Sequence, residues 1–203
     1  MARGPGRSHE DTRQAIVNLA CEVVAEHGVE ALTYRRVAAA GVSPGRVQHY
    51  FPDRATLVRA CFDEVQERAM NRVRASLGEG TPSAFEVVRA VLRAMIPRDV
   101  EEARELKVMA MFETLALTEP TLHQALRDGY AELRRLLTDQ VAKARQRLPA
   151  DHGESVVAAK MLLAVAEGLS GQVLHGHLTA DEALRTIDET LARVLGGSRD
   201  SEE

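Results

Sequence analysis

The segment from Ser43 to Phe51 carries polar side chains that could read the base edges of nucleic acid. Arg46 can offer two N–H donors to O6 and N7 of guanine, and Gln48 can form the equivalent pair with adenine. Each such bidentate pair contributes about 1–3 kcal/mol of discrimination against another base. These residue types are therefore suited to reading bases in DNA, with Arg46 as the main reader.

A short helix must hold these side chains. Ser43 followed by Pro44 is typical of a helix start, because proline at the first helical position gives up an N–H that has no partner within the helix. Val47 and Phe51 are four residues apart and face the core, which leaves Arg46 and Gln48 outward. A helix of about two turns fits the major groove of DNA, which is about 12 Å wide.

Two preceding helices complete a helix-turn-helix. The first is expected over residues 9–27, where apolar residues recur at helical spacing, and Gly28 ends it. The second begins after the N-cap Thr33 and ends near residue 40, before Gly41. Residues 33–51 then form two short helices joined by a tight turn, the arrangement found in many DNA-binding proteins.

The rest of the chain has the helical period throughout. Further helices are expected over about 53–76, 83–95, 100–117, 121–148, 154–174 and 181–195. No alternating β-branched run occurs, so we predict an all-α protein of about nine helices. Residues 1–55 are expected to form the DNA-binding domain, with 1–8 as a flexible arm. Residues 56–203 are expected to form a helical effector-binding and dimerisation domain, with 196–203 disordered.

Composition favours a globular, cytoplasmic protein. The formal net charge is −4, but residues 1–60 contain eight Arg against six acidic residues, so the N-terminal part is the one suited to phosphate. The N-terminus lacks the apolar stretch of a secretory signal. Cys21 and Cys61 both occupy apolar helical positions, which indicates reduced core thiols. Neither a metal nor another cofactor is expected.

The stretch GVSPGRVQHYFPDRATLV resembles the recognition-helix signature of the TetR family of transcriptional regulators. The resemblance covers about the first quarter of the chain. It departs from the family at Gln48, where an aromatic residue is usual, and in a second helix that is one residue short. The surface it implies has phosphate contacts from Thr33, His49, Tyr50 and Arg54, base contacts from Pro44, Gly45, Arg46 and Gln48, and neighbouring positions Tyr34, Arg35 and Ser43.

The last two predicted helices suggest a homodimer. Apolar residues repeat at alternating spacings of three and four, and two glycines permit close approach of a neighbouring helix. The resemblance implies a two-fold four-helix interface made by Gly168, Gly171, Leu184, Ile187, Leu191 and Val194. An ordinary core seam within one chain is the alternative.

The resemblance also implies a pocket for a small-molecule effector. Candidate lining residues are mostly large and adaptable: Phe85, Met95, Met109, Met111, Phe112, Glu113, Leu115 and Tyr130. The low aromatic content favours an aliphatic or small polar compound. His175 and His177 could suggest a metal site, but their spacing of two on a helix favours a solvated helix end.

We therefore expect a dimeric repressor that a small-molecule effector releases from a palindromic operator in double-stranded DNA. No catalytic triad or phosphate-binding loop is recognisable, so an enzyme is not expected. The alternative is an all-helical small-molecule-binding or enzymatic domain in which the helix-turn-helix is only a packing motif.

Overall fold

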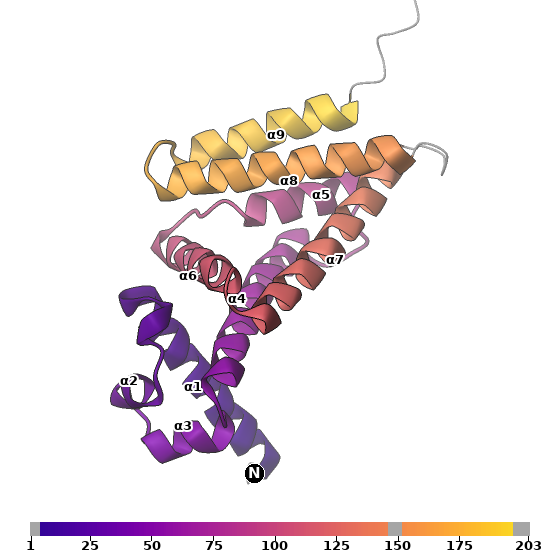
Figure 1. The fold of residues 1–203 in the computed structure, drawn as a ribbon. Helices are drawn as coiled ribbons and strands as arrows, with labels where there is room; N and C mark the ends of the chain where they lie inside the picture. Colours follow the sequence, from indigo (N-terminus) through magenta and orange to yellow (C-terminus); the bar gives the residue numbers. More distant parts are fainter. Residues whose placement is uncertain (1–4, 146–151, 197–203) are drawn as a thin grey trace, which may run out of the picture. The chain divides into compact units, whose positions relative to one another are not determined.

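The computed structural model describes residues 5–145 and 152–196, and within these ranges all regular secondary structure is helical (Figure 1). Nine α-helices and one 3-10 turn, η1, are present there and no strand is, so the all-α prediction is confirmed. The elements are α1 (Pro5–His27), η1 (Val29–Ala31), α2 (Tyr34–Ala39), α3 (Pro44–Tyr50), α4 (Arg54–Leu77), α5 (Ala84–Ala94), α6 (Val100–Ala116), α7 (Pro120–Ala144), α8 (His152–Leu174) and α9 (Ala180–Gly196).

Local sequence signals explain most of the helix ends. Gly28 ends α1 with φ of 82°, a backbone conformation that glycine adopts without a steric penalty. Ser83 and Glu86 form a reciprocal capping box at the start of α5. Helix α1 begins at Pro5, four residues before its predicted start, so the backbone of residues 5–8 is helical where a flexible arm was expected. The rest of that arm and the predicted tail beyond Gly196 lie outside the described residues.

The chain divides into two compact units. Met1–Arg68 and Arg104–His123 make up unit 1, and Ala69–Ala103 and Gln124–Glu203 make up unit 2. Unit 1 thus contains α1 to α3, the first part of α4 and most of α6. The boundary expected at residue 55 falls one residue after α4 begins, and it stays a prediction.

Unit 1 has an apolar interior beneath the short helices. Ile16 and Val24 of α1 and Leu57 of α4 are fully buried. Phe62 of α4 meets Phe112 of α6 edge to face, with ring centroids 6.1 Å apart. Helices α2 and α3 pack against this interior through buried apolar side chains.

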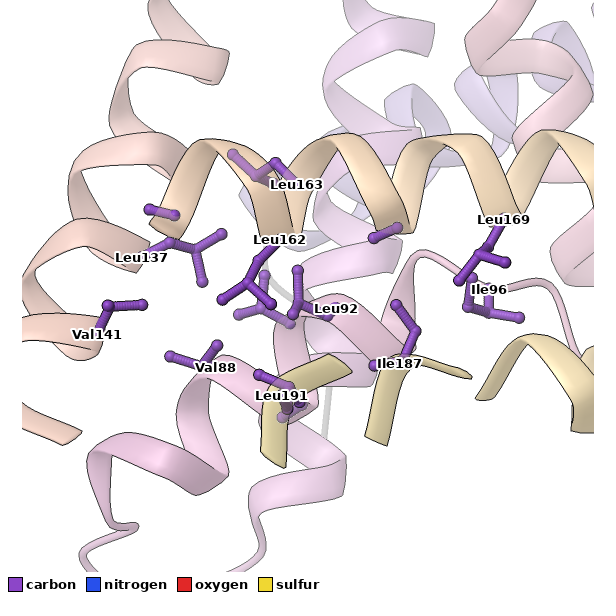
Figure 2. Packing of buried hydrophobic residues seen from close by; sticks show 14 of the residues in the cluster. Val88, Leu92, Ile96, Leu137, Val141, Leu162, Leu163, Leu169, Ile187 and Leu191 are labelled. Atoms are coloured by element: carbon purple, nitrogen blue, oxygen red, sulfur yellow. The ribbon is translucent and has the colours of Figure 1, made fainter. Parts of the chain in front are cut away.

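Unit 2 has its own core, in which α5, α8 and α9 pack together. Figure 2 shows Val88 and Leu92 of α5 close to Leu162 of α8 and to Leu191 of α9. At the surface, Asp188 of α9 accepts hydrogen bonds from Arg89 and Arg93 of α5. The packing of α5 against α9 therefore combines buried apolar side chains with two ion pairs at the surface.

The apolar stripe of α9 belongs mostly to this core. Leu184, Ile187 and Leu191 are each at most 8% exposed, and Val194 packs against the same cluster. These side chains were expected at a dimer interface. The structure instead places them in the intramolecular seam that was the alternative, because α5 and α8 cover them within one chain.

Helix α8 is long and apolar enough to cross a membrane by length and composition alone. However, 39% of its most apolar stretch is buried inside the protein, and Leu162, Leu163 and Ala166 lie in the unit 2 core. We therefore describe α8 as a core helix with one apolar face still exposed.

Candidate DNA-binding surface

Helix α3 is a short, firmly anchored element of unit 1. The Ser43 hydroxyl accepts a hydrogen bond from the Arg46 backbone N–H at 3.2 Å, which caps the helix start. Val47 and Phe51 are fully buried, and the Phe51 N–H closes the helix onto the Val47 carbonyl at 2.9 Å. The buried pair fixes which face of α3 points outward.

The opposite face of α3 is exposed. Arg46, Gln48 and His49 all lie on the solvent side, as the spacing of Val47 and Phe51 predicts. Ser43, Pro44 and Gly45 are exposed as well, and Tyr50 is half-buried. A short exposed helix that carries Arg46 and Gln48 has the donor groups that base-edge contacts in a major groove require.

Helix α2 supports α3 and has only six residues. Its N-cap Thr33 accepts a hydrogen bond from the Arg36 N–H at 3.3 Å, while the Arg35 side chain is exposed. The Tyr34 hydroxyl donates to the Phe51 carbonyl at 2.7 Å. Burial, and secondarily the Asp53 carboxylate, raises the Tyr34 pKa. Tyr34 therefore braces α3, and its phenol proton is already used within the protein.

Arg54 was expected to contact phosphate, but its guanidinium is engaged inside unit 1. Nη2 donates to the Val29 carbonyl at 2.9 Å, and Nε donates to the Leu32 carbonyl at 3.2 Å. The side chain is 39% exposed and lies 3.7 Å from the Glu30 carboxylate. Arg54 thus ties the start of α4 to the turn before α2, a role that its position in the sequence does not indicate.

Sequence reasoning missed His9, which lies against the end of the recognition helix. Its ring centroid is 4.4 Å from that of Tyr50 and 6.3 Å from that of His49. One turn further along α1, the Arg13 guanidinium lies over the Phe51 ring at 5.3 Å. Side chains of α1 therefore extend the exposed surface of α3.

A polar network joining three helices was also missed. The Arg68 guanidinium donates to the Glu64 carboxylate at 2.7 Å and to the Asn18 side chain at 2.8 Å. It also lies 3.5 Å from the carboxylate of Glu105, a buried residue of α6. Gln14 of α1 completes the network by donating to Glu64 at 2.6 Å. Partners 50 residues apart leave no local signal in the sequence.

The two cysteines are buried free thiols in unit 1. The Cys21 thiol points at the Cys61 carbonyl, with sulfur and oxygen 3.8 Å apart. The pKa of the Cys61 thiol is raised well above the usual range, first by the hydrogen bond between Cys61 and Cys21 and then by burial. Such a thiol stays protonated at neutral pH, which suits a core residue.

The predicted effector-pocket residues are divided between the two units. Phe112 and Leu115 lie in the interior of unit 1, while Met109 and Met111 are half-buried and Glu113 is exposed. In unit 2, Met95 packs against the core, whereas Phe85 and Tyr130 are 41% and 42% exposed. Burial of Tyr130 raises its pKa, and burial likewise raises that of Glu167, its hydrogen-bond partner on α8.

Unit 2 contains a hollow of about 510 Å³ that includes none of these eight residues. It is lined by the end of α4, the following loop and α5, with Arg72, Arg89, Arg93 and Arg98 among its side chains. The arginines are already matched by carboxylates, since Asp188 binds Arg89 and Arg93, and Glu102 binds Arg98. The hollow therefore offers little unbalanced charge to a ligand.

His175 and His177 lie in the turn after α8, with ring centroids 6.1 Å apart and both side chains exposed. Within residues 5–145 and 152–196, no three His, Cys, Asp or Glu side chains gather as a metal site would require.

Comparison with known proteins identifies both parts of the chain. Residues 16–61 match the sequence family described as bacterial regulatory proteins of the tetR family. Residues 84–196 match the family described as BetI-type transcriptional repressor, C-terminal. The first match contains the surface of α3, and the second covers more than half of the chain.

Full-length relatives agree with these matches. The chain is 28% identical over 192 residues to the HTH-type transcriptional regulator PksA of Bacillus subtilis, covering 92% of this chain and 87% of PksA. It is 27% identical to the HTH-type transcriptional regulator BetI of Klebsiella pneumoniae, covering 90% and 89% of the two chains.

Solved structures show the same fold. A transcriptional regulator from Rhodococcus sp. superposes with a TM-score of 0.75 at 24% identity, covering 91% of this chain and 96% of the other. A transcriptional regulator from Saccharomonospora viridis, solved in complex with choline, gives 0.75 at 19% identity, covering 89% and 95%. Together with the exposed recognition helix, these matches show that the chain belongs to the TetR family of DNA-binding transcriptional regulators and carries a BetI-type C-terminal domain.

Proposed function

We propose that this regulator is a dimeric repressor that reads a palindromic operator through α3 and leaves it when a small-molecule effector binds. The observation that carries the proposal is the exposure of Arg46 and Gln48 on a helix anchored by the buried Val47 and Phe51. Ser43, Pro44 and Gly45 would meet DNA from the same first turn. Thr33, Arg35 and His49 would meet phosphates beside it.

Selection of bound sequences from random duplex DNA tests this function. The full-length protein should enrich an inverted repeat whose half-sites are about one helical turn, roughly 34 Å, apart or a multiple of this. Binding should weaken steeply with salt, because Lys and Arg contacts to phosphate release counterions. Absence of any enriched sequence would favour the alternative, in which the helix-turn-helix is only a packing motif.

The exposed face of α8 supports the dimer. Val157 and Met161 are each 56% exposed, and the small residues Ala164 and Gly168 follow on the same face, with Gly171 half-buried at its edge. The spacing of four, three, four and three residues is that of a helix that packs against another helix. An exposed apolar stripe on a core helix is typical of a protein interface.

Replacing Met161 by Glu tests this interface. Two carboxylates at an isologous contact would repel each other and lose apolar burial, so the variant should be monomeric by light scattering at micromolar concentration. Leu117→Glu is the matched control, because Leu117 is 80% exposed on the loop after α6 and should leave the dimer intact. A dimeric Met161→Glu protein would place the interface elsewhere.

The effector is proposed to be a small cation of the choline type. Support comes from the choline complex of the structurally similar S. viridis regulator. In this chain, Tyr130 and Glu167 supply an aromatic ring beside a carboxylate to which it is hydrogen-bonded. Such a pair attracts a quaternary ammonium group through the ring face and the negative charge.

Calorimetric titration with choline checks this effector class. Wild-type protein should bind choline, and Glu167→Gln should weaken binding while leaving operator affinity unchanged. Choline should also release the operator, since an effector shifts the equilibrium only if it prefers the DNA-incompetent conformation. No binding at millimolar choline would exclude this class, without bearing on DNA recognition. The whole cycle would take place in the cytoplasm, where the operator is.

A further inference from the structure

Two imidazoles from different helices converge where α3 ends. Tyr50 packs against both, with ring centroids 4.4 Å from His9 of α1 and 5.3 Å from His49 of α3. The two imidazole centroids are 6.3 Å apart, and both side chains are exposed. They border the surface on which the recognition helix is exposed.

Positive charge surrounds this pair. Arg13 follows His9 by one turn of α1, and Arg46 precedes His49 by one turn of α3, so each lies on the same helix face as its imidazole. The resulting surface has two permanent cations and two groups that can each take up a proton.

The nearby carboxylates have other partners or directions. Glu10 lies 3.7 Å from the Arg13 guanidinium. Asp53 accepts hydrogen bonds from the Thr56 N–H and hydroxyl, both at 2.7 Å. Asp11 is two residues after His9 and so projects from the opposite side of α1. A DNA phosphate is the anion that the imidazole pair fits.

We propose that His9 and His49 form a proton-linked phosphate clamp, in which operator binding draws a proton onto the imidazole pair. The inference rests on the proposed DNA-binding function and extends it, since it adds a residue of α1 to the contact surface and makes affinity depend on pH.

Linkage gives the direction of the effect. A phosphate placed against the pair favours the charged form of the imidazoles. The complex therefore holds more protons than the separated molecules, and affinity must rise as pH falls through the range near pH 6.5 in which histidine ordinarily titrates.

Operator affinity measured at pH 7.5 and pH 6.0 tests the clamp. The probe is a duplex obtained by selection, and random duplex is measured in parallel. Wild-type protein should bind about three- to tenfold more tightly at pH 6.0, which corresponds to a mean net uptake of about one-third to two-thirds of a proton over this interval. Calorimetry in two buffers of different ionisation enthalpy should show that proton uptake directly.

His9→Asn is the decisive variant, because it leaves α3 untouched. It should lose at least half of the pH effect, on selected and random duplex alike, since phosphates carry no sequence information. His49→Asn should behave in the same way. His123→Asn is the matched control, an exposed histidine at the start of α7 that should keep the wild-type pH dependence.

The outcomes are separable. If His9→Asn and His49→Asn keep the wild-type pH dependence, the cluster is a packing contact and the clamp is wrong, while the DNA-binding function stands. The same conclusion follows if wild-type affinity does not change with pH. If the wild-type protein binds no duplex at either pH, the proposed function itself fails. Thermal melting of each variant confirms that it is folded.

Discussion

Replacing Arg54 by Ala separates two roles that predict opposite results. The structure shows this guanidinium donating to the Val29 and Leu32 carbonyls, at 2.9 and 3.2 Å, rather than projecting freely toward solvent. Hydrogen bonds from a charged donor contribute about 1.5–3 kcal/mol each when well shielded. With the side chain 39% exposed, we discount this to about 1 kcal/mol per bond, or about 2 kcal/mol for the variant.

The assay is denaturant unfolding followed by circular dichroism at one fixed protein concentration. A loss of about 2 kcal/mol corresponds to a melting temperature about 4–8 °C lower in a chain of this size. Glu30→Gln is the matched control, because it removes only the exposed ion pair at 3.7 Å and should cost less than about 0.5 kcal/mol.

The salt dependence of DNA binding gives the opposing result. If Arg54 ties α4 to the turn before α2, the slope of log affinity against log salt should stay the same in the variant. Unchanged stability, together with a slope smaller by about 0.9 for each lost phosphate contact, would refute our assignment and restore Arg54 to the phosphate-binding set.

Two further predictions concern the anchoring of each unit. Val47→Ala should destabilise unit 1 by about 2 kcal/mol, since two methyl groups of a fully buried side chain are lost and a small cavity remains; unfolding at the wild-type denaturant concentration would contradict the anchoring role. Asp188→Asn should cost about 1 kcal/mol at pH 7, because Asp188 joins α9 to Arg89 and Arg93 of α5. Hydrogen bonding from Arg89 is the main reason that the Asp188 pKa lies below its usual value. Partial burial of the carboxylate opposes this lowering, and the charge of Arg93 adds to it. That stabilisation should therefore be present above about pH 4 and disappear as pH falls further, and a constant difference between wild type and variant across that range would be inconsistent with it.

The recognition helix was predictable because its determinants are local. The cap at Ser43, the proline after it and the four-residue spacing of Val47 and Phe51 all lie within nine residues, and the structure places each as the spacing requires. Helix order and most boundaries follow from similar local signals.

The destinations of long side chains were not predictable in the same way. Arg54 binds carbonyls 22 and 25 residues earlier, and Arg68 reaches Asn18 across 50 residues. Neither distance leaves a trace in composition or periodicity. His9 was missed for the same reason, since its contact with Tyr50 depends on how α1 crosses α3.

The apolar stripe of α9 illustrates a different limit. An apolar stripe of Leu184, Ile187 and Leu191 indicates that the helix packs against something, but it does not say whether the neighbour belongs to the same chain. In this protein α5 and α8 bury it, and the exposed apolar face belongs to α8 instead. The sequence pattern therefore predicted that α9 has an apolar face that packs against other helices, but it did not predict which helices cover that face.

The most direct test of the central claim is the affinity of Arg46→Ala for a selected operator, for variants of that operator changed one base pair at a time, and for random duplex. We predict a loss of about 1–3 kcal/mol per half-site on the operator, loss of preference at a single symmetry-related position, and nearly unchanged binding to random DNA. Equal weakening on operator and random duplex would mean that Arg46 contacts phosphate and that α3 does not read sequence through this side chain.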